Sequence, residues 1–158
     1  MPRALPYHRP IAIASIDHAA IPTDRPDEMI AFYRGLGFAV VGEEAWRDGS
    51  AIGFAVALGD SKINVHGPSA WRDARFTLRG PTAVPGCGDF CFVWTGTVDD
   101  AVELLTSIGA AIEVGPVDRV GGRSSGTATG RSVYTRDPDG NLLELITYPD
   151  PTAGAAPG

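Results

Sequence analysis

The sequence predicts an α+β fold in which two tandem βαβββ modules form one curved mixed sheet. Two observations lead to this prediction. The order of one strand, one helix and three further strands occurs twice along the chain. The spacing also repeats, since His18 precedes the helix-ending Gly37 by 19 residues and Asp89 precedes Gly109 by 20 residues. A duplicated module of this size accounts for most of the 158 residues.

The first module is expected at residues 11–67, after an N-terminal arm at residues 1–10. Its helix begins with a capping-type residue, Thr23, shortly before Pro26, and it ends near Leu36 between two glycines. An apolar stripe along this helix indicates the side that packs on the sheet. The strands of the first module are expected at 11–21, 38–44, 50–58 and 61–66.

The second module is expected at residues 88–148, after a linker loop at 67–87, so that 11–148 forms a single domain. Thr97 opens its helix and Gly109 ends it. A segment rich in glycine, serine and threonine is predicted to be a mobile loop, and the last ten residues a disordered tail. The strands are expected at 88–95, 111–114, 131–136 and 142–147, the mobile loop at 121–130 and the tail at 149–158.

Composition excludes several classes of function. The net charge of −6 and the pI of about 4.9 argue against nucleic acid or an anionic membrane as a partner. No stretch reaches 18 apolar residues, so the sequence predicts no membrane span. Cys87 and Cys91 are the only cysteines, and their spacing does not favour a disulfide between them. The sequence therefore predicts a reduced, cytoplasmic protein.

Glu144 is the residue around which the site is predicted. It interrupts an aliphatic strand that follows the tight turn at 137–140. Alternation places it on the same face as Leu142 and Ile146, two side chains that are expected to be buried. An ionised carboxylate in such surroundings needs water or a cation beside it. The other ligands of a bound metal ion are therefore sought at matched positions of the repeat.

Matching the two modules pairs His18 with Asp89 and His66 with Glu144. Each of these residues alone could have a structural role in place of metal ligation, for example at a strand end, in a turn or in an ion pair with an arginine. Together, two imidazoles and two carboxylates suit one divalent ion: zinc, nickel, cobalt, manganese or iron. The predicted metal ligands are His18, His66, Asp89 and Glu144.

Four sequence motifs resemble the vicinal oxygen chelate superfamily, which includes glyoxalase I, fosfomycin-resistance proteins, extradiol dioxygenases, some epimerases and bleomycin-resistance proteins. The resemblance covers about residues 15–148 and is closest to the glyoxalase-domain-containing protein 5 group. It implies the same fold, and it implies metal ligation by His18, His66 and Glu144. Asp89 departs from the family pattern, where many relatives carry histidine. The motifs lie at 16–18, 32–38, 62–66 and 137–144.

The resemblance implies a substrate that binds the metal through two vicinal oxygens. Ligation by all four residues leaves two open positions on an octahedral ion, as in a glyoxalase, isomerase or epimerase. Proton transfer next to a carbonyl would then use Glu144 or Asp89 as the base. Ligation by His18, His66 and Glu144 alone leaves three positions, as an Fe(II) extradiol dioxygenase needs. The lack of a strong further acid or base favours the first of these alternatives.

A third alternative is a protein related to bleomycin-resistance proteins, which sequesters a ligand without catalysis. For either kind of site, loop arginines are candidates to steer an anionic group. Because small modules of this kind have sheet edges to bury, we expect a homodimer, with each metal site shared between chains. The predicted substrate-binding residues are Arg72, Arg119, Arg123 and Tyr134.

Overall fold

The computed structural model describes residues 13–149 and contains two four-stranded mixed sheets. In the first sheet, β1 (His18–Pro22) runs parallel to β4 (Ser61–His66), which pairs antiparallel with β3 (Gly53–Leu58), and β3 pairs with β2 (Ala39–Val41). The second sheet repeats this order with β5 (Asp89–Val93), β8 (Leu142–Thr147), β7 (Thr129–Arg136) and β6 (Val114–Val120). The predicted pair of βαβββ modules is confirmed.

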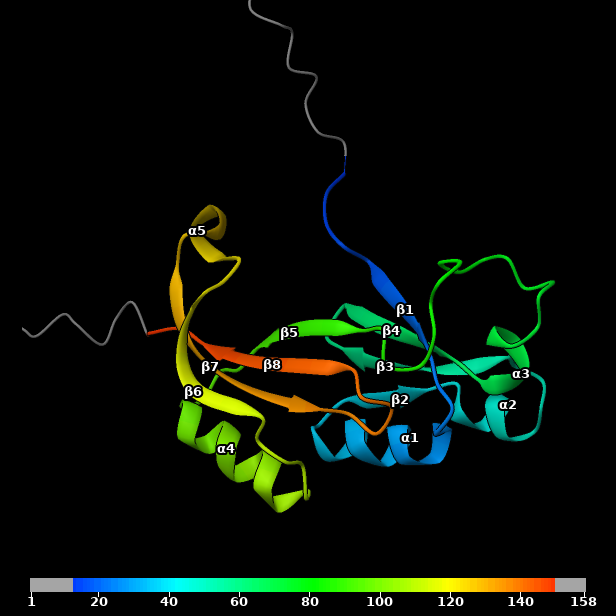
Figure 1. Cartoon of the computed structure of the whole chain (residues 1–158), viewed down its shortest axis with the longest axis horizontal. Helices are drawn as coiled ribbons and strands as arrows, with labels where there is room; N and C mark the ends of the chain where they lie inside the picture. The colour runs from blue at the N-terminus through cyan, green and yellow to red at the C-terminus, as the bar shows by residue number, and fades with distance from the viewer. Residues whose placement is uncertain (1–12, 150–158) are drawn as a thin grey trace, which may run out of the picture.

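The two long helices lie on the same side of the sheets (Figure 1). Helix α1 (Pro26–Gly35) belongs to the first module, and α4 (Val98–Ser107) belongs to the second. Proline occupies the first turn of α1, and the Thr97 side chain caps α4, as the sequence predicts. The opposite side of both sheets carries no long helix, and we call it the open face.

The short elements differ from the sequence prediction. Helix α2 (Glu43–Arg47) replaces the expected end of the second strand, because Gly42 adopts a φ of +79° and turns the chain. Strand β6 begins at Val114, where the expected strand ends, and it continues past Pro116. An edge strand tolerates this proline because its outer N–H groups need no partner. Two further one-turn helices lie in predicted loops: α3 (Pro68–Trp71) and α5 (Arg123–Gly126).

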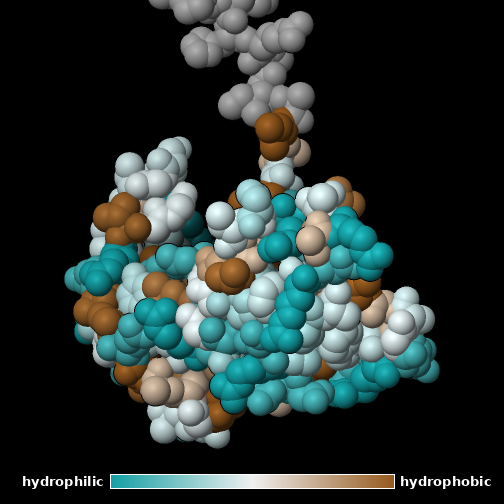
Figure 2. Space-filling view, turned by 45° about the vertical axis from the view of Figure 1, so that its right-hand side comes forward, coloured by the Kyte–Doolittle hydropathy of each residue, from teal (hydrophilic) through white to brown (hydrophobic). Residues whose placement is uncertain are grey.

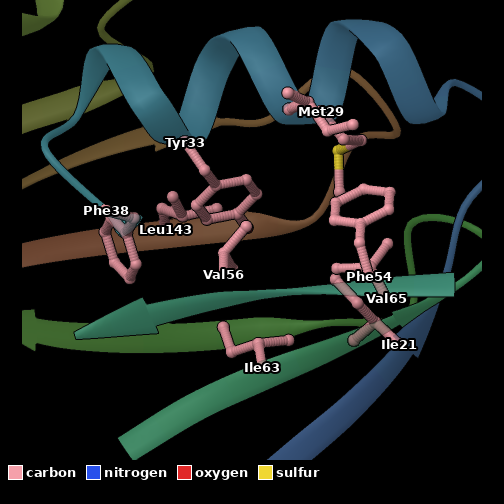
Figure 3. Close-up of a cluster of buried hydrophobic side chains, with 10 residues drawn as sticks. Ile21, Met29, Tyr33, Phe38, Phe54, Val56, Ile63, Val65 and Leu143 are labelled. Carbon is pink, nitrogen blue, oxygen red and sulfur yellow. The ribbon is translucent and has the colours of Figure 1, made fainter. Parts of the chain in front are cut away.

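The main core lies between α1 and the first sheet (Figure 3). Met29 and Tyr33 of α1 are fully buried there against Val56 and Val65. Leu143 of β8 belongs to the same cluster, so the second module contributes to the core of the first. A smaller cluster lies under α4. Its buried members are Ala101, Leu105, Val133 and Leu145.

The turn at residues 137–141 connects the two modules through hydrogen bonds. The Tyr33 hydroxyl donates to Oδ2 of the buried Asp137 across 2.9 Å. The Asn141 side-chain amide donates to the same oxygen across 2.7 Å. Asp139 accepts hydrogen bonds from the Thr23 hydroxyl and from the backbone N–H of Asp24. The second module therefore fixes the start of α1 in the first.

The surface gives no sign of a large apolar patch on the side shown in Figure 2, where apolar residues are scattered among polar ones. Within residues 13–149, every helix is too short or too polar to cross a membrane. Both cysteines are free thiols. The predicted arm, and the predicted tail after its first residue, lie outside the part of the chain that the structure describes.

Candidate functional site

Glu144 lies at the middle of the second sheet, on the open face. Its strand neighbours Leu143 and Leu145 point into the core, so alternation turns Glu144 the other way. Cys91 of β5 stands opposite it on one side, and Tyr134 of β7 stands opposite it on the other. The carboxylate is therefore flanked on both sides by side chains with a hydrogen-bond donor.

Ser132 holds one oxygen of this carboxylate. Its hydroxyl, which is fully buried, donates to Glu144 Oε1 across 2.5 Å. Partial burial of the Cys91 thiol, together with the neighbouring Glu144 charge, raises the pKa of this otherwise exposed residue to about 12. Cys91 therefore stays protonated and acts as a neutral neighbour of the carboxylate rather than as a reactive thiolate. Ser132 and Cys91 are not among the predicted site residues, although both lie on the Glu144 face of the sheet.

Arg119 brings a positive charge to the row of cross-strand neighbours formed by Cys91, Glu144 and Tyr134. Its Nε donates to the Tyr134 hydroxyl across 3.2 Å, and its guanidinium lies 5.6 Å from the centre of the ring. Burial raises the pKa of Tyr134, as does the Glu144 carboxylate, and Arg119 acts against this rise. Tyr134 consequently keeps its proton near neutral pH and can donate a hydrogen bond to a ligand. A cavity of about 290 Å³ opens beside Arg119 and Tyr134.

The other two predicted substrate-binding arginines have local partners. Arg72 forms an ion pair with Asp24 across 2.6 Å and lies over the Trp71 ring. Arg123 lies 4.6 Å from the centre of the Tyr148 ring. Arg119 is thus the predicted arginine that the structure places in the row of Glu144.

His18 and Asp89 begin the two edge strands β1 and β5. Both line a cavity of about 510 Å³ between the modules, whose walls include Phe38 and Phe92. His18 Nδ1 lies 2.6 Å from Asp17 Oδ1, which leaves Nε2 free when the shared proton is on Nδ1. The structure therefore brings these two predicted ligands to one cavity.

His66 lies apart from His18 on the same strand pair. His18 is opposite Lys62, and His66 follows four residues later, which corresponds to about 13 Å along the strand. The centre of its ring lies 5.1 Å from the centre of the Phe76 ring, and the two rings are almost perpendicular; partial burial lowers the pKa of His66. The dioxygenase alternative needs His18 and His66 on one ion, and within one chain the two side chains do not meet.

Strand register also changes how the two modules match. His18 pairs with Lys62, and Asp89 pairs with Leu142 in the equivalent strands. Two residues further along, Asn64 occupies the position that Glu144 has in the second module. The sequence prediction matched His66 to Glu144, but His66 corresponds to Ile146. Asn64 and His66 stand on the same face of β4, so the sequence pattern alone does not show which of them matches Glu144. The register of β4 against β1 is needed to decide.

The predicted ligands do not form a metal site within one chain. Across residues 13–149, no three histidine, cysteine, aspartate or glutamate side chains lie close enough together to hold a metal ion. One chain thus brings His18 and Asp89 to the cavity between the modules, and it leaves His66 at the far end of β4. His18, His66, Asp89 and Glu144 do not fit a single ion in this arrangement.

Comparison with known proteins covers almost the whole described chain. The model of the Glyoxalase/Bleomycin resistance protein/Dioxygenase superfamily matches residues 15–145. The chain is 35% identical over 144 residues to the glyoxalase domain-containing protein RDO1 of Mycosarcoma maydis, covering 90% of this chain and 73% of that protein. It is 34% identical over 139 residues to the virulence protein STM3117 of Salmonella typhimurium, covering 86% and 85% of the two chains. The crystal structure of that protein superposes with a TM-score of 0.72 and covers 87% of this chain and 99% of that one.

Proposed function

Because the chain belongs to the glyoxalase, bleomycin resistance protein and dioxygenase superfamily, we propose that it binds a small oxygen-rich substrate on its open face and transfers a proton. The observation that carries this proposal is the environment of Glu144. Its carboxylate lies on the open face, with Ser132 fixing one oxygen and Tyr134 standing opposite. A fixed carboxylate beside a fixed hydroxyl donor is the arrangement that proton abstraction next to a carbonyl requires.

Glu144 is the proposed base. An ionised carboxylate accepts up to about four hydrogen bonds, so the bond from Ser132 leaves it free to accept a proton from a substrate carbon. Loss of that proton moves negative charge onto the neighbouring carbonyl oxygen. Tyr134 donates a hydrogen bond to this oxygen, and Arg119 holds the phenol while adding positive charge. Returning the proton to the same or to another carbon completes an isomerase, epimerase or glyoxalase-type reaction.

Deuterium incorporation tests this proposal without knowledge of the natural substrate. Small α-hydroxycarbonyl compounds, such as hydroxyacetone, are incubated with the protein in D₂O and followed by proton NMR. We expect protein-dependent loss of the signal of the proton next to the carbonyl. Glu144→Gln should slow this exchange at least 100-fold, since positioned bases contribute about 10² to 10⁴ in rate. Exchange that is equally fast in Glu144→Gln would contradict the role of Glu144.

A matched carboxylate serves as the control. Glu103 lies in α4, on the helix side of the second sheet and away from the open face. Glu103→Gln removes the same charge and should leave exchange within about twofold of the wild type. Tyr134→Phe should slow exchange less than Glu144→Gln, because it removes a hydrogen bond to the oxygen and leaves the base in place.

Metal binding is proposed for an assembly of two chains. The predicted ligands do not fit one ion within a chain, and a second copy can supply the missing ones. Light scattering gives the mass of the purified protein, and elemental analysis of the same sample gives its metal content. We expect a homodimer with one zinc, nickel, cobalt, manganese or iron ion per site, lost in His18→Ala. A monomer, or a dimer that takes up no metal on titration, would reject a shared site.

A second candidate function is sequestration of a ligand without catalysis. The cavity of about 510 Å³ between the modules favours it, because its walls include Phe38, Phe92 and Ile63. The deuterium experiment separates the two candidates. A compound that raises the melting temperature but never exchanges its protons in any sample supports sequestration, whereas exchange that depends on Glu144 supports the enzyme.

A further inference from the structure

The open face of the first sheet carries a row of three polar side chains on β4. Ile63 and Val65 are buried in the core cluster of Figure 3. The alternate residues Lys62, Asn64 and His66 therefore point to the open face, about 6.6 Å apart along the strand. A lysine, an asparagine and a histidine offer both hydrogen-bond donors and acceptors there.

The neighbours of this row are small, which leaves it accessible. Asn64 lies between Ala20 of β1 and Ala55 of β3, so the side chains directly opposite it on both neighbouring strands are methyl groups. His66 lies opposite Gly53 in the same register. A cavity of about 300 Å³ opens above these residues, at the lower end of the range for small-molecule sites. A side chain larger than alanine at these neighbouring positions would fill part of this space.

Within residues 13–149, the side chains of Lys62, Asn64 and His66 form no hydrogen bond or ion pair. The pKa of Asp17 is lowered mainly by His18, whose Nδ1 lies 2.6 Å from its carboxylate, and to a smaller extent by Lys62, with which Asp17 forms no ion pair. Lys62 therefore brings one positive charge that forms no ion pair with the described residues, and Asn64 brings an amide whose donor and acceptor form no hydrogen bond with them. The Phe76 ring packs almost perpendicular to His66 at the far end of the row.

We propose that Lys62 and Asn64 form a binding site for a small hydroxycarboxylate, with His66 at its far end. One lysine balances the charge of one carboxylate, and its ammonium group donates to the carboxylate oxygens. Asn64, one step along the strand, then reaches a hydroxyl or carbonyl oxygen two or three bonds away in the ligand. This site uses side chains of the first module alone, so it does not depend on proton transfer at Glu144.

Side-chain amide NMR of the full chain tests the proposal directly. The sequence contains two asparagines and no glutamine, so a ¹⁵N-labelled sample gives side-chain NH₂ signals from Asn64 and Asn141 alone. Asn141 is fully buried and bound to Asp137 and Gly88, which makes it an internal control. Sodium glycerate is the probe, titrated to about 50 mM at constant ionic strength. We expect a saturable shift of the Asn64 signals and none of the Asn141 signals.

Two further probes and three variants complete the experiment. Acetate lacks the hydroxyl group and glycerol lacks the charge, so each should bind at least about fivefold more weakly than glycerate. Lys62→Met should weaken glycerate binding about tenfold or more, and Lys62→Arg should restore part of it. Arg47→Met removes a positive charge from α2 of the same module, outside the cavity above β4, and should leave binding unchanged.

The outcomes separate this site from the proposed enzyme. A linear drift of the Asn64 signals, equal shifts at Asn141, or glycerate binding that survives Lys62→Met would overturn the site. Binding that is intact in Glu144→Gln supports a site confined to the first module. Failure of the deuterium experiment would then count against the proposed reaction and leave the β4 site standing.

Discussion

Asp137 shows how a single buried carboxylate is accommodated without a cation beside it. Burial raises its pKa, and the hydrogen bonds from Asn141 and Tyr33 act in the opposite direction. The carboxylate accepts from the Tyr33 hydroxyl, from the side chain and the backbone of Asn141, and from the backbone of Asp139. Four donors satisfy the four lone-pair sites of an ionised carboxylate, which offsets most of the cost of burying it.

Tyr33→Phe is expected to lower the free energy of unfolding by about 1 to 3 kcal/mol, because it leaves a buried carboxylate short of one donor. Urea unfolding at pH 7 measures the change. Tyr148→Phe is the matched control, since its ring keeps the contact with Arg123 when the hydroxyl is removed. A loss no greater than that of the control would show that the hydroxyl does not stabilise Asp137.

The same tyrosine predicts behaviour at high pH. Burial raises the pKa of Tyr33 far above its usual value, and the Asp137 charge adds to this rise. A raised pKa in the folded state means that the stabilisation is complete below about pH 10 and is lost as the pH rises above it, because the unfolded tyrosine ionises there. Between pH 9 and 11 the wild type should therefore lose more stability than Tyr33→Phe. Absorbance at 295 nm should show the same number of ionising tyrosines in both proteins until they unfold.

At the scale of elements, α4 depends on its first turn. Thr97 accepts a hydrogen bond from the backbone N–H of Asp100, and the Asp100 carboxylate accepts one from the backbone N–H of Thr97. This reciprocal pair satisfies two N–H groups that the helix itself leaves without partners. Because α4 covers the second sheet, weakening this cap should weaken the packing under it.

Thr97→Ala is expected to cost about 1 kcal/mol of stability, as is usual for loss of an N-cap hydroxyl. Thr106→Ala makes the same chemical change in the last turn of the same helix, where the hydroxyl only bonds back to Val102. Thermal unfolding of the two variants provides the comparison. Equal melting temperatures would mean that the capping pair contributes nothing to the stability of the helix.

The elements that sequence predicted well have clear local signals. Strand β4 has the predicted bounds because glycine-containing turns lie next to it and its aliphatic residues alternate. Helix α2 was missed because five residues are too few to show a helical period, and its start depends on Gly42. The match between Asn64 and Glu144 was missed for a different reason. Register is set by pairing between distant strands, and both Asn64 and His66 fit the same alternation.

At the scale of the whole molecule, Phe92 joins the two hydrophobic clusters. Its ring packs against members of both, and it meets Phe38 edge-on at a centroid distance of 5.1 Å. Because Phe92 contacts both clusters, unfolding of one module should destabilise the other, and the chain should unfold in one transition. The sequence could identify Phe92 as a strand residue, but only the packed structure shows which clusters it connects.

Phe92→Ala is expected to lower the free energy of unfolding by about 3 kcal/mol, the lower end for a core phenylalanine, because the ring is only partly buried. Calorimetry should also show a broader transition than in the wild type. Leu78→Ala serves as the control, since Leu78 is 83% exposed and should change stability by less than about 0.5 kcal/mol. A sharp transition with unchanged stability in Phe92→Ala would show that the clusters are coupled elsewhere.

The candidate site is the part that sequence predicted least completely. Alternation along one strand is a local property, so the sequence could predict which residues share a face with Glu144, whereas only the pairing of β7 with β8 shows that Tyr134 lies opposite it. The distance between His18 and His66 depends on how β1 pairs with β4, which no local pattern reveals. Whether the four predicted metal ligands meet within one chain or across two chains depends on the assembly. The sequence of a single module cannot predict this.

The 137–141 turn holds the two modules together independently of the segment that links them. The halves are joined covalently by residues 72–88, which contain no helix or strand, yet Tyr33 with Asp137 and Thr23 with Asp139 tie them together through side chains. A chain cut between residues 72 and 88 therefore keeps the contacts that hold the halves together. Two separately expressed fragments should therefore reassemble into the same fold.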